Sequence, residues 1–276
     1  MAPELWQAAL LGVVQGLTEF LPVSSTGHLI LVPAILGWRG GVVDSLQFDV
    51  ALHLGTLIAL LAVFWRDWLE LIGPALASLT RRSLADAHAR LAWFIVLGTI
   101  PGVVAGALLQ KQVETTLRSP IVIGAAMIIV AFALAVLDRI GPQTRDEYSL
   151  GPGGALAIGI GQAFALIPGV SRSGSTIATG LGLGMTRASA ARFSFLLSTP
   201  IIAGALAKEG LDVARQGLGA DERLVFAVGI VAAGISGYLC IRFLLAYLRR
   251  HSLMPFVIYR IVAGGAVLIL AANGRL

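Results

Sequence analysis

Charged residues are scarce in this sequence. Lys, Arg, Asp and Glu account for 13% of its 276 residues, whereas roughly a quarter is usual in a soluble domain. Hydrophobic residues account for 57%, and the mean hydropathy is +0.87. Apolar runs of the ~17–25 residues needed to cross a bilayer recur along the whole chain. This composition excludes an ordinary soluble enzyme, and we expect an integral membrane protein.

Cysteine is almost absent as well. The single Cys240 excludes an internal disulfide, and its place in an apolar run is typical of a small buried hydrophobic residue. The first apolar stretch has no basic leader and contains Gln15 and Glu19, so we expect no cleavable signal peptide. We interpret the net charge of +5 as an orientation signal of cytoplasmic loops, and we expect no nucleic-acid partner.

Six apolar runs predict transmembrane helices. Pro120 and Pro255 fall at the starts of two of them, where the missing N–H of proline costs nothing. The remaining charge lies in connecting loops, such as the one expected at Arg66–Arg90. The expected spans are Phe48–Trp65, Leu91–Leu109, Pro120–Leu137, Ala191–Ala207, Leu224–Leu244 and Pro255–Leu270.

Two further apolar stretches are each interrupted by a polar segment, Glu19–His28 in the first and Pro168–Thr176 in the second. Neither segment has the run of charges typical of an exposed loop. Non-helical backbone at membrane depth is tolerated only where protein or a water-filled cavity surrounds it. We therefore predict two re-entrant helix hairpins with polar turns, and ordinary surface loops between spanning helices are the alternative.

The two hairpins resemble each other. Val23–Gly27 matches Val170–Gly174 at an offset of 147 (170 − 23), and Pro120–Ile123 echoes Pro255–Ile258. We infer a duplication with pseudo-repeats 1–140 and 150–276 in a single membrane domain. Each half has one re-entrant hairpin and three transmembrane helices, an odd number of crossings. The predicted fold is therefore an all-α polytopic membrane protein with an inverted-topology repeat, in which the two turns meet near the midplane.

Basic residues indicate the orientation. The side richer in them is expected to be cytoplasmic, which places both termini outside and lets the first hairpin enter from the outer face. The richer side holds Arg66, Arg81, Arg82, Arg90, Arg139, Arg145, Arg187, Arg249 and Arg250, and the other holds Arg39, Lys111, Arg118, Lys208, Arg215 and Arg223.

Glu19 is an ionisable residue within an apolar helix, which by default indicates a functional site. Gln15 lies one turn earlier on the same helix face. Together these side chains offer oxygen ligands for a hard divalent cation, Mg²⁺ or Ca²⁺. The alternative is that Glu19 only forms a structural ion pair with Arg172.

Arg172 lies in the second turn, and its planar guanidinium matches phosphate oxygens in pairs. Gly174 lets backbone N–H groups approach an anion, and a helix that starts nearby directs its positive end to the same place. This pattern predicts an oxyanion cradle, although a serine-rich turn that merely caps a helix is the alternative. The hydroxyl residues of the cradle are Ser171, Ser173, Ser175 and Thr176.

His28 follows the hydroxyl residues of the first turn and could act as a general acid or as a nucleophile. For His53 we favour a structural role, and for Arg260 a position at the membrane interface. The buried acid, the candidate cation and the cradle of arginine and hydroxyl groups indicate phosphate chemistry at a membrane. An anion-coupled transporter could use the same groups. The hydroxyl residues of the first turn are Ser24, Ser25 and Thr26.

Gln15–His28 (QGLTEFLPVSSTGH) and Pro168–Gly174 (PGVSRSG) resemble the two motifs of the undecaprenyl-diphosphatase family, also called the bacitracin-resistance protein family. The resemblance covers almost the full length. It implies hydrolysis of undecaprenyl diphosphate, a polyprenyl lipid, to undecaprenyl phosphate and inorganic phosphate in the bacterial inner membrane. This reaction recycles the lipid carrier for cell-wall synthesis. The resemblance leaves open whether the protein forms a homodimer.

The resemblance also implies roles for the residues of the two turns. Arg172 holds the diphosphate, and Glu19 and Gln15 position the cation or an attacking group. Many relatives carry Glu where this chain has Gln15, and Gln cannot ionise, which places more of the role on Glu19. Ser25 or His28 could form a covalent intermediate, or Glu19 and the metal could activate water. Further phosphate-binding residues in this interpretation are Ser24, Thr26, Ser171, Ser173, Gly174 and Thr176.

A lipid-phosphate flippase or anion transporter is the second class of function, because inverted repeats with hairpins near the midplane are its usual architecture. A phospholipid-phosphatase-type enzyme is less favoured, since the paired His and Arg spacing of that class is not evident. Phosphate release in detergent separates hydrolysis from transport, because transport leaves no trace there.

Overall fold

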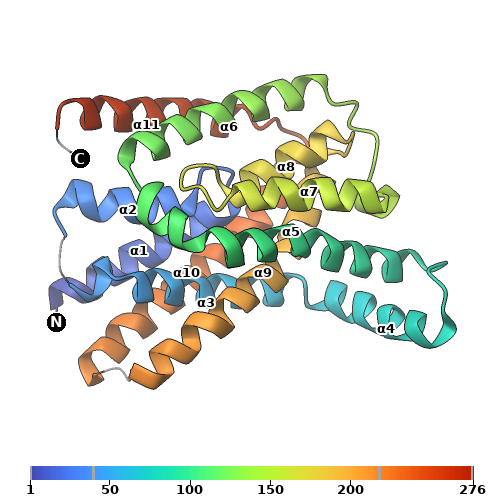
Figure 1. Ribbon diagram of the computed structural model, residues 1–276, viewed down its shortest axis with the longest axis horizontal. Coiled ribbons are helices and arrows are strands. Elements are labelled where there is room, and N and C mark those ends of the chain that lie inside the picture. Colours follow the sequence, from blue (N-terminus) through green and yellow to red (C-terminus); the bar gives the residue numbers. More distant parts are fainter. Residues whose placement is uncertain (1, 39–40, 217–218, 275) are drawn as a thin grey trace.

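The computed structural model describes residues 2–38, 41–216, 219–274 and 276. Within these ranges it consists of α-helices and two 3-10 turns, Val42–Asp44 and Glu147–Ser149. Figure 1 shows most helices running along the longest axis of the molecule. The helices are α1 (Ala2–Phe20), α2 (Ser25–Leu36), α3 (Leu46–Val63), α4 (Trp65–Arg81), α5 (Ala87–Thr116), α6 (Pro120–Ile140), α7 (Pro152–Phe164), α8 (Arg172–Gly182), α9 (Arg187–Gln216), α10 (Ala220–Tyr247) and α11 (Met254–Ala272).

The six predicted transmembrane helices are confirmed among the described residues. Their ends lie a few residues from those expected, because helical hydrogen bonding continues through charged residues such as Arg187 and Glu222 that lower the local hydropathy. The observed spans are Leu46–Val63, Ala87–Leu109, Pro120–Ile140, Arg187–Lys208, Glu222–Tyr247 and Met254–Ala272.

Two helix hairpins occupy the places predicted for them. Helix α2 has 12 residues and α8 has 11, so each is about 18 Å long or less, short of the ~30 Å hydrocarbon core. In Figure 1, α1 and α2 extend from the left end and α7 and α8 from the right end, and their turns lie together in the middle. An inverted-topology repeat with boundaries at 1–140 and 150–276 is compatible with this arrangement and stays a prediction.

The contacts between helices are compatible with two equivalent halves. If the halves are equivalent, α3 corresponds to α9, α5 to α10, α6 to α11 and α1 to α7. Helices α3 and α9 pack together, as do α6 and α11. Helix α1 packs on α10, and the corresponding pair, α7 and α5, also packs. Exchanging the two halves would therefore map the α3–α9 and α6–α11 interfaces onto themselves, and the α1–α10 interface onto the α7–α5 interface.

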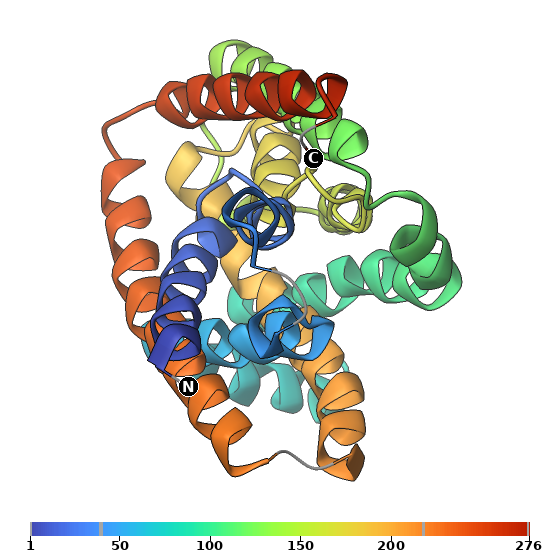
Figure 2. The same ribbon diagram turned by 90° about the vertical axis from the view of Figure 1, so that its left-hand side faces the viewer.

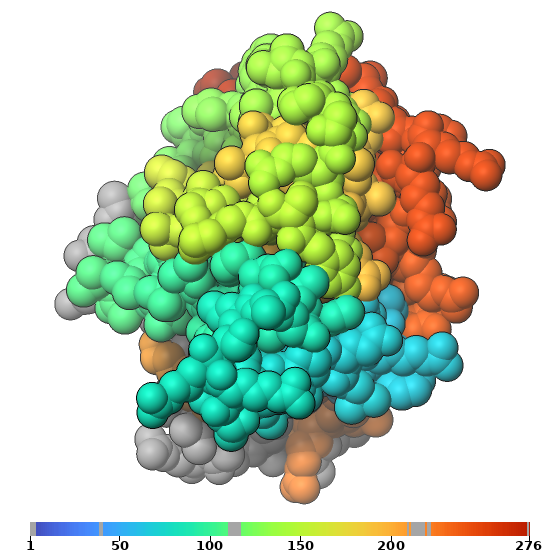
Figure 3. All heavy atoms as spheres, turned by 90° about the vertical axis from the view of Figure 1, so that its right-hand side faces the viewer, coloured from blue at the N-terminus to red at the C-terminus, as the bar shows by residue number. Residues whose placement is uncertain are grey.

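The prediction of a loop at Arg66–Arg90 is wrong, because helix α4 occupies most of this segment. A hydropathy average over this segment hides its periodicity, in which large apolar residues recur every three or four positions. Helix α4 packs against α5 at the end of the molecule seen in Figure 3. The exposed apolar stripe of α4 consists of Trp65, Leu69, Ile72, Leu76 and Leu79.

Different helix ends and connections lie at the two ends of the molecule. Figure 2 looks onto the end at which α1 begins, α9 ends and α10 begins. Figure 3 looks onto the opposite end, where the connections from α4 to α5 and from α6 to α7 lie. The arginine-rich connections that the sequence assigned to one side are therefore at one end.

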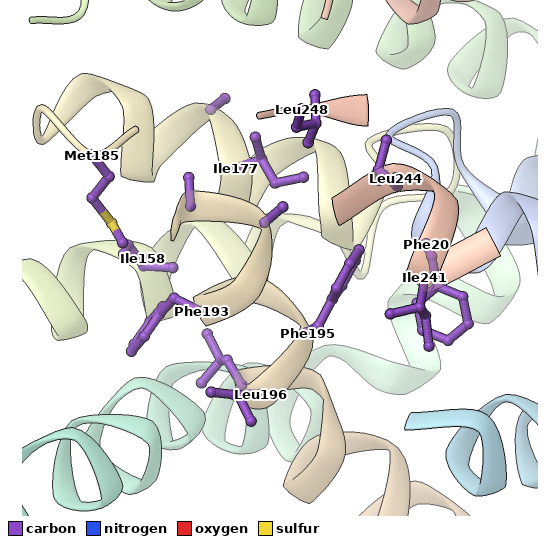
Figure 4. Packing of buried hydrophobic residues seen from close by; sticks show 14 of the residues in the cluster. Phe20, Ile158, Ile177, Met185, Phe193, Phe195, Leu196, Ile241, Leu244 and Leu248 are labelled. Atoms are coloured by element: carbon purple, nitrogen blue, oxygen red, sulfur yellow. The ribbon is translucent and has the colours of Figure 1, made fainter. Parts of the chain in front are cut away.

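The main apolar core surrounds α9, which crosses the middle of the molecule (Figure 4). Phe195 of α9 contacts Phe20 edge-to-face, with ring centroids 5.4 Å apart, and both side chains are fully buried. Because Phe20 directly follows Glu19, this packing fixes the end of α1 and the direction of the acid.

Helix α1 approaches α10 closely enough to exclude side chains. A Cβ atom added to Gly16 would lie 2.6 Å from the Ala233 carbonyl oxygen and would also meet the Ser236 hydroxyl. Small residues permit such close backbone approach between helices in membranes. The packing leaves Gln15, the neighbour of Gly16, fully buried.

Candidate active site

Each hairpin turn ends in a serine with an unusual backbone. Ser24 has φ 80° and Ser171 has φ 72°, values that residues with a side chain adopt rarely and at a cost of about 1–3 kcal/mol. The Ser24 hydroxyl accepts a hydrogen bond from Gly27 N (3.4 Å), and the Ser171 hydroxyl accepts one from Gly174 N (3.1 Å). The N-termini of α2 and α8, with their partial positive charge, therefore begin at matching positions in the two turns.

The two turns touch each other. Gly169 N donates to the Ser24 hydroxyl (3.2 Å), and the Ser173 hydroxyl donates to the Leu21 carbonyl (2.9 Å). Gly169 has φ +95°, and a Cβ added to it would lie 2.9 Å from Ile123 Cα in α6. The second turn can thus pass between the first turn and α6 only because this position is glycine.

Arg260 joins the turns from behind, and its predicted position at the membrane interface is wrong. Its side chain is 0% exposed. The guanidinium donates to the carbonyls of Pro22 (3.0 Å), Gly169 (2.8 Å) and Val170 (3.1 Å), and to two carbonyls of α6. Irregular turns leave carbonyl groups without helical partners, and these acceptors draw the arginine inward rather than to the surface.

Glu19 is the centre of a hydrogen-bonded cluster and is only 6% exposed. Its Oε1 atom accepts from Arg172 Nη2 (3.1 Å). Its Oε2 atom accepts from the Ser25 hydroxyl (2.6 Å) and from Gln15 Nε2 (3.1 Å). His53 Nε2 lies 3.6 Å from the same oxygen. The structure therefore places the Arg172 guanidinium and the Ser25 hydroxyl on the two oxygens of the same buried carboxylate.

Arg172 keeps an unused donor in this arrangement. Its Nη1 atom donates to the Ser194 carbonyl at 3.3 Å, and Nη2 is taken up by Glu19. Its Nε atom is buried and has no partner in the part of the chain that the structure describes. A buried N–H group without a partner is unfavourable, so the guanidinium is suited to take an additional acceptor.

A cavity of about 230 Å³ lies beside this cluster. One part of its lining is polar and contains Glu19, Ser24, Ser25, Thr26, His53, Gln162, Ser171 and Arg172. The other lining residues are Gly102 of α5 and apolar residues of α3, of the turn after α7 and of α9, namely Val50, Ala165, Leu166, Ile201, Ile202, Ala205 and Leu206. A ligand held there would meet both polar groups and hydrocarbon.

Three residues of the predicted cradle lie behind Arg172 and not on the cavity wall. The Thr176 hydroxyl donates to the Arg172 carbonyl (2.7 Å) and is 2.6 Å from the Ser194 hydroxyl. Ser173 and Gly174 are buried in the contact between the turns. These contacts hold Arg172 in place, and direct binding of phosphate by the three residues stays a prediction.

His28 faces away from Glu19. Its Nδ1 atom is 2.7 Å from the Ser24 carbonyl oxygen, and its Nε2 atom is 2.5 Å from the Tyr259 hydroxyl. The imidazole also stacks on the Tyr259 ring. Both ring nitrogens thus have partners, His28 is not among the residues that line the cavity, and its catalytic role stays a prediction.

The sequence did not identify two residues of the cavity as parts of the site. His53 was expected to be structural, yet it lines the cavity and approaches Glu19. Gln162 was not singled out, although the repeat offset of 147 (162 − 15) makes it the counterpart of Gln15. The duplication was the signal that could have found it.

The donor set suits a cation that is shared with a substrate. The described residues contain no group of three or more His, Cys, Asp or Glu side chains that could hold a metal ion. Gln15 Oε1 is buried and has no partner among the described residues, and Glu19 supplies one carboxylate beside it. Mg²⁺ commonly takes one or two carboxylates together with substrate phosphates, and Glu19 with Gln15 fits that pattern.

Comparison with known proteins identifies the family of this chain. The model of a family described as bacitracin resistance protein BacA matches residues 8–266. Proteins named undecaprenyl-diphosphatase from Pelotomaculum thermopropionicum and Desulforudis audaxviator are 47% and 48% identical to the chain, over at least 96% of it and 97% of their own lengths. Undecaprenyl-diphosphatase 2 of Stutzerimonas stutzeri is 47% identical over 97% of the chain and 98% of its own length. The chain belongs to the bacitracin resistance protein BacA family.

Proposed function

We propose that this membrane protein hydrolyses undecaprenyl diphosphate to undecaprenyl phosphate and inorganic phosphate, which returns the lipid carrier to cell-wall synthesis. The observation that carries the proposal is one cavity in which Glu19, Ser25 and Arg172 adjoin an apolar wall. A polyprenyl diphosphate has the same two-part character. The names of relatives at 47–48% identity support this substrate.

Arg172 and the two helix N-termini bind the diphosphate. Phosphoryl transfer depends mainly on positioning and on stabilisation of charge at the equatorial oxygens. The unpaired Nε–H of Arg172 supplies a donor for one of them. The backbone of the turns lies at the positive ends of α2 and α8 and supports the same charge.

Ser25 attacks the terminal phosphorus in this mechanism. Its hydroxyl already donates to Glu19 Oε2 at 2.6 Å, the arrangement of a nucleophile with its base. The proton passes to Glu19 as the bond between Oγ and phosphorus forms and the bond to the bridging oxygen breaks. Undecaprenyl phosphate leaves, and water then cleaves the phosphoserine to restore Ser25 and release inorganic phosphate. Attack by His28, or by water directly, is the alternative.

A divalent cation, Mg²⁺ or Ca²⁺, would be held by Glu19 and Gln15 together with the diphosphate. When bound, it neutralises charge on the phosphate oxygens. We expect a chelator to reduce phosphate release to background and added Mg²⁺ or Ca²⁺ to restore it. We also expect the chelator to leave the unfolding temperature of the substrate-free protein unchanged, because the cation is shared with the substrate. Full activity in chelator would contradict this role.

Release of phosphate by the purified protein in detergent tests the function itself. Undecaprenyl diphosphate should release inorganic phosphate, whereas undecaprenyl phosphate should not, because it lacks the anhydride bond. A folded protein that binds the diphosphate in detergent but releases nothing would contradict the hydrolase and favour a lipid-phosphate flippase or anion transporter.

The cavity opens to the outer face in our proposal. Val50 and His53 of its lining lie in the first half of α3, which begins at the end where α1 also begins (Figure 1), and the arginine-rich connections lie at the other end. We therefore expect Asn273→Cys to react with a membrane-impermeant maleimide in intact spheroplasts, and Ser83→Cys to react only after the membrane is opened. Native Cys240 is 3% exposed and gives little background. The reverse labelling pattern would overturn the orientation.

A further inference from the structure

Gln162 has a side chain whose hydrogen-bonding groups have no partner among the residues that the structure describes. It is 4% exposed, and both its Nε2 and Oε1 atoms are buried without a partner in the described part of the chain. A buried primary amide of this kind is unfavourable, and in native proteins it calls for an explanation. The residue lines the same cavity as Glu19 and Arg172.

The packing of α5 against α7 holds Gln162 at this place. A Cβ added to Gly159 would lie 2.9 Å from Gly98 Cα, so the two helices approach at their backbones. One turn further on, a Cβ added to Gly102 would lie 3.3 Å from Gln162 Nε2 and 3.3 Å from Ile201 Cδ1. The amide and the Ile201 side chain therefore both lie against Gly102, and all three residues line the cavity.

The internal repeat explains why this amide lacks a partner. In the first half, Gln15 Nε2 donates to Glu19, four residues later on α1. In the second half, the residue four positions after Gln162 is Leu166, which has no acceptor. If the two halves are equivalent, the second half therefore has the amide without the carboxylate, and this amide lines the cavity.

We propose that Gln162 binds the substrate and that its amide N–H donates to the phosphate that stays on the lipid. This inference rests on the proposed function. A phosphate oxygen then takes the place that the Glu19 carboxylate holds in the first half. We assign the lipid-bound phosphate to Gln162 because its amide and the Ile201 side chain both lie against Gly102, whereas Arg172 and Ser25 are bonded to Glu19.

The variant Gln162→Leu tests this role, with Gln47→Leu on the exposed start of α3 as the matched control. We expect the KM for a polyprenyl diphosphate to rise roughly 10- to 100-fold, the effect of losing a hydrogen bond to a charged group, with a much smaller change in kcat. The inhibition constant of polyprenyl monophosphate should rise by a similar factor. The inhibition constant of inorganic phosphate, which lacks the lipid-bound phosphate, should not change.

The same Gln162→Leu change is not expected to destabilise the ligand-free protein, although it weakens substrate binding. Because neither amide atom has a partner, replacing it with an apolar group of similar size should leave the unfolding temperature unchanged or raise it. Addition of polyprenyl monophosphate should then raise the unfolding temperature of the parent and of Gln47→Leu more than that of Gln162→Leu. This readout needs no turnover, so it separates failure of this inference from failure of the hydrolase. An unchanged KM, or equal stabilisation by the monophosphate in all three proteins, would overturn it.

Discussion

Replacement of Arg172 by alanine is expected to reduce phosphate release by about 10³-fold or more, the range lost when an arginine that stabilises phosphoryl transfer is removed. The guanidinium lies against Glu19 and has a spare buried N–H next to the cavity. Its loss removes the donors expected to hold the terminal phosphate. Phosphate release from undecaprenyl diphosphate in detergent measures the effect.

Stability is the necessary control for this variant. Without Arg172 the buried Glu19 carboxylate loses its partner, which typically costs about 3–5 kcal/mol. The double variant Arg172→Ala/Glu19→Gln removes both charges, and it should regain unfolding temperature without regaining activity. Arg249→Ala, exposed at the end of α10, should retain both. Near-normal turnover by a folded Arg172→Ala protein would contradict the mechanism.

Replacement of Glu19 by glutamine should have a comparable effect on turnover. Gln keeps the size of the side chain and an oxygen that accepts from Ser25, but it cannot take a proton at neutral pH. Loss of a general base commonly reduces the rate by about 10²–10⁴-fold, and loss of the proposed cation ligand adds to this. The measurement is kcat at saturating cation, with Glu70→Gln on the exposed surface of α4 as the matched control.

A second pair of variants separates the roles of Glu19 and Ser25. Glu19→Asp keeps the carboxylate but withdraws it by one methylene, so part of the activity should remain. Ser25→Ala should be as inactive as Glu19→Gln if the serine is the nucleophile, and it should form no phosphoenzyme. Substantial turnover by Ser25→Ala would instead assign the attack to water or to His28.

Much of the fold could be predicted because its signals are local. Six spans follow from apolar length, and the two hairpins follow from polar turns within apolar flanks. Helix α4 could not be found by average hydropathy, since its charges offset its apolar stripe. Its period of three to four residues was present in the sequence and would have identified it.

The candidate site could be predicted in part for a similar reason. Glu19, Ser25 and Arg172 stand out as polar residues in apolar surroundings, and the structure brings them into contact. The position of Arg260 depends on free carbonyls in turns far away in the sequence, which no local pattern reveals. Which atoms face the cavity likewise depends on tertiary packing, so the sequence could not separate Ser171 on the wall from Ser173 behind it.

The place of Arg260 on the last described helix bears on biosynthesis. Its guanidinium connects the Pro22 carbonyl of the first turn to the Gly169 and Val170 carbonyls of the second. Nascent chains leave the ribosome from their N-terminus, so both turns are synthesised well before this side chain. Until α11 inserts, the carbonyls lack their shared donor and the two halves are not joined at this point. The contact that joins the two turns is therefore completed only when α11 is in place.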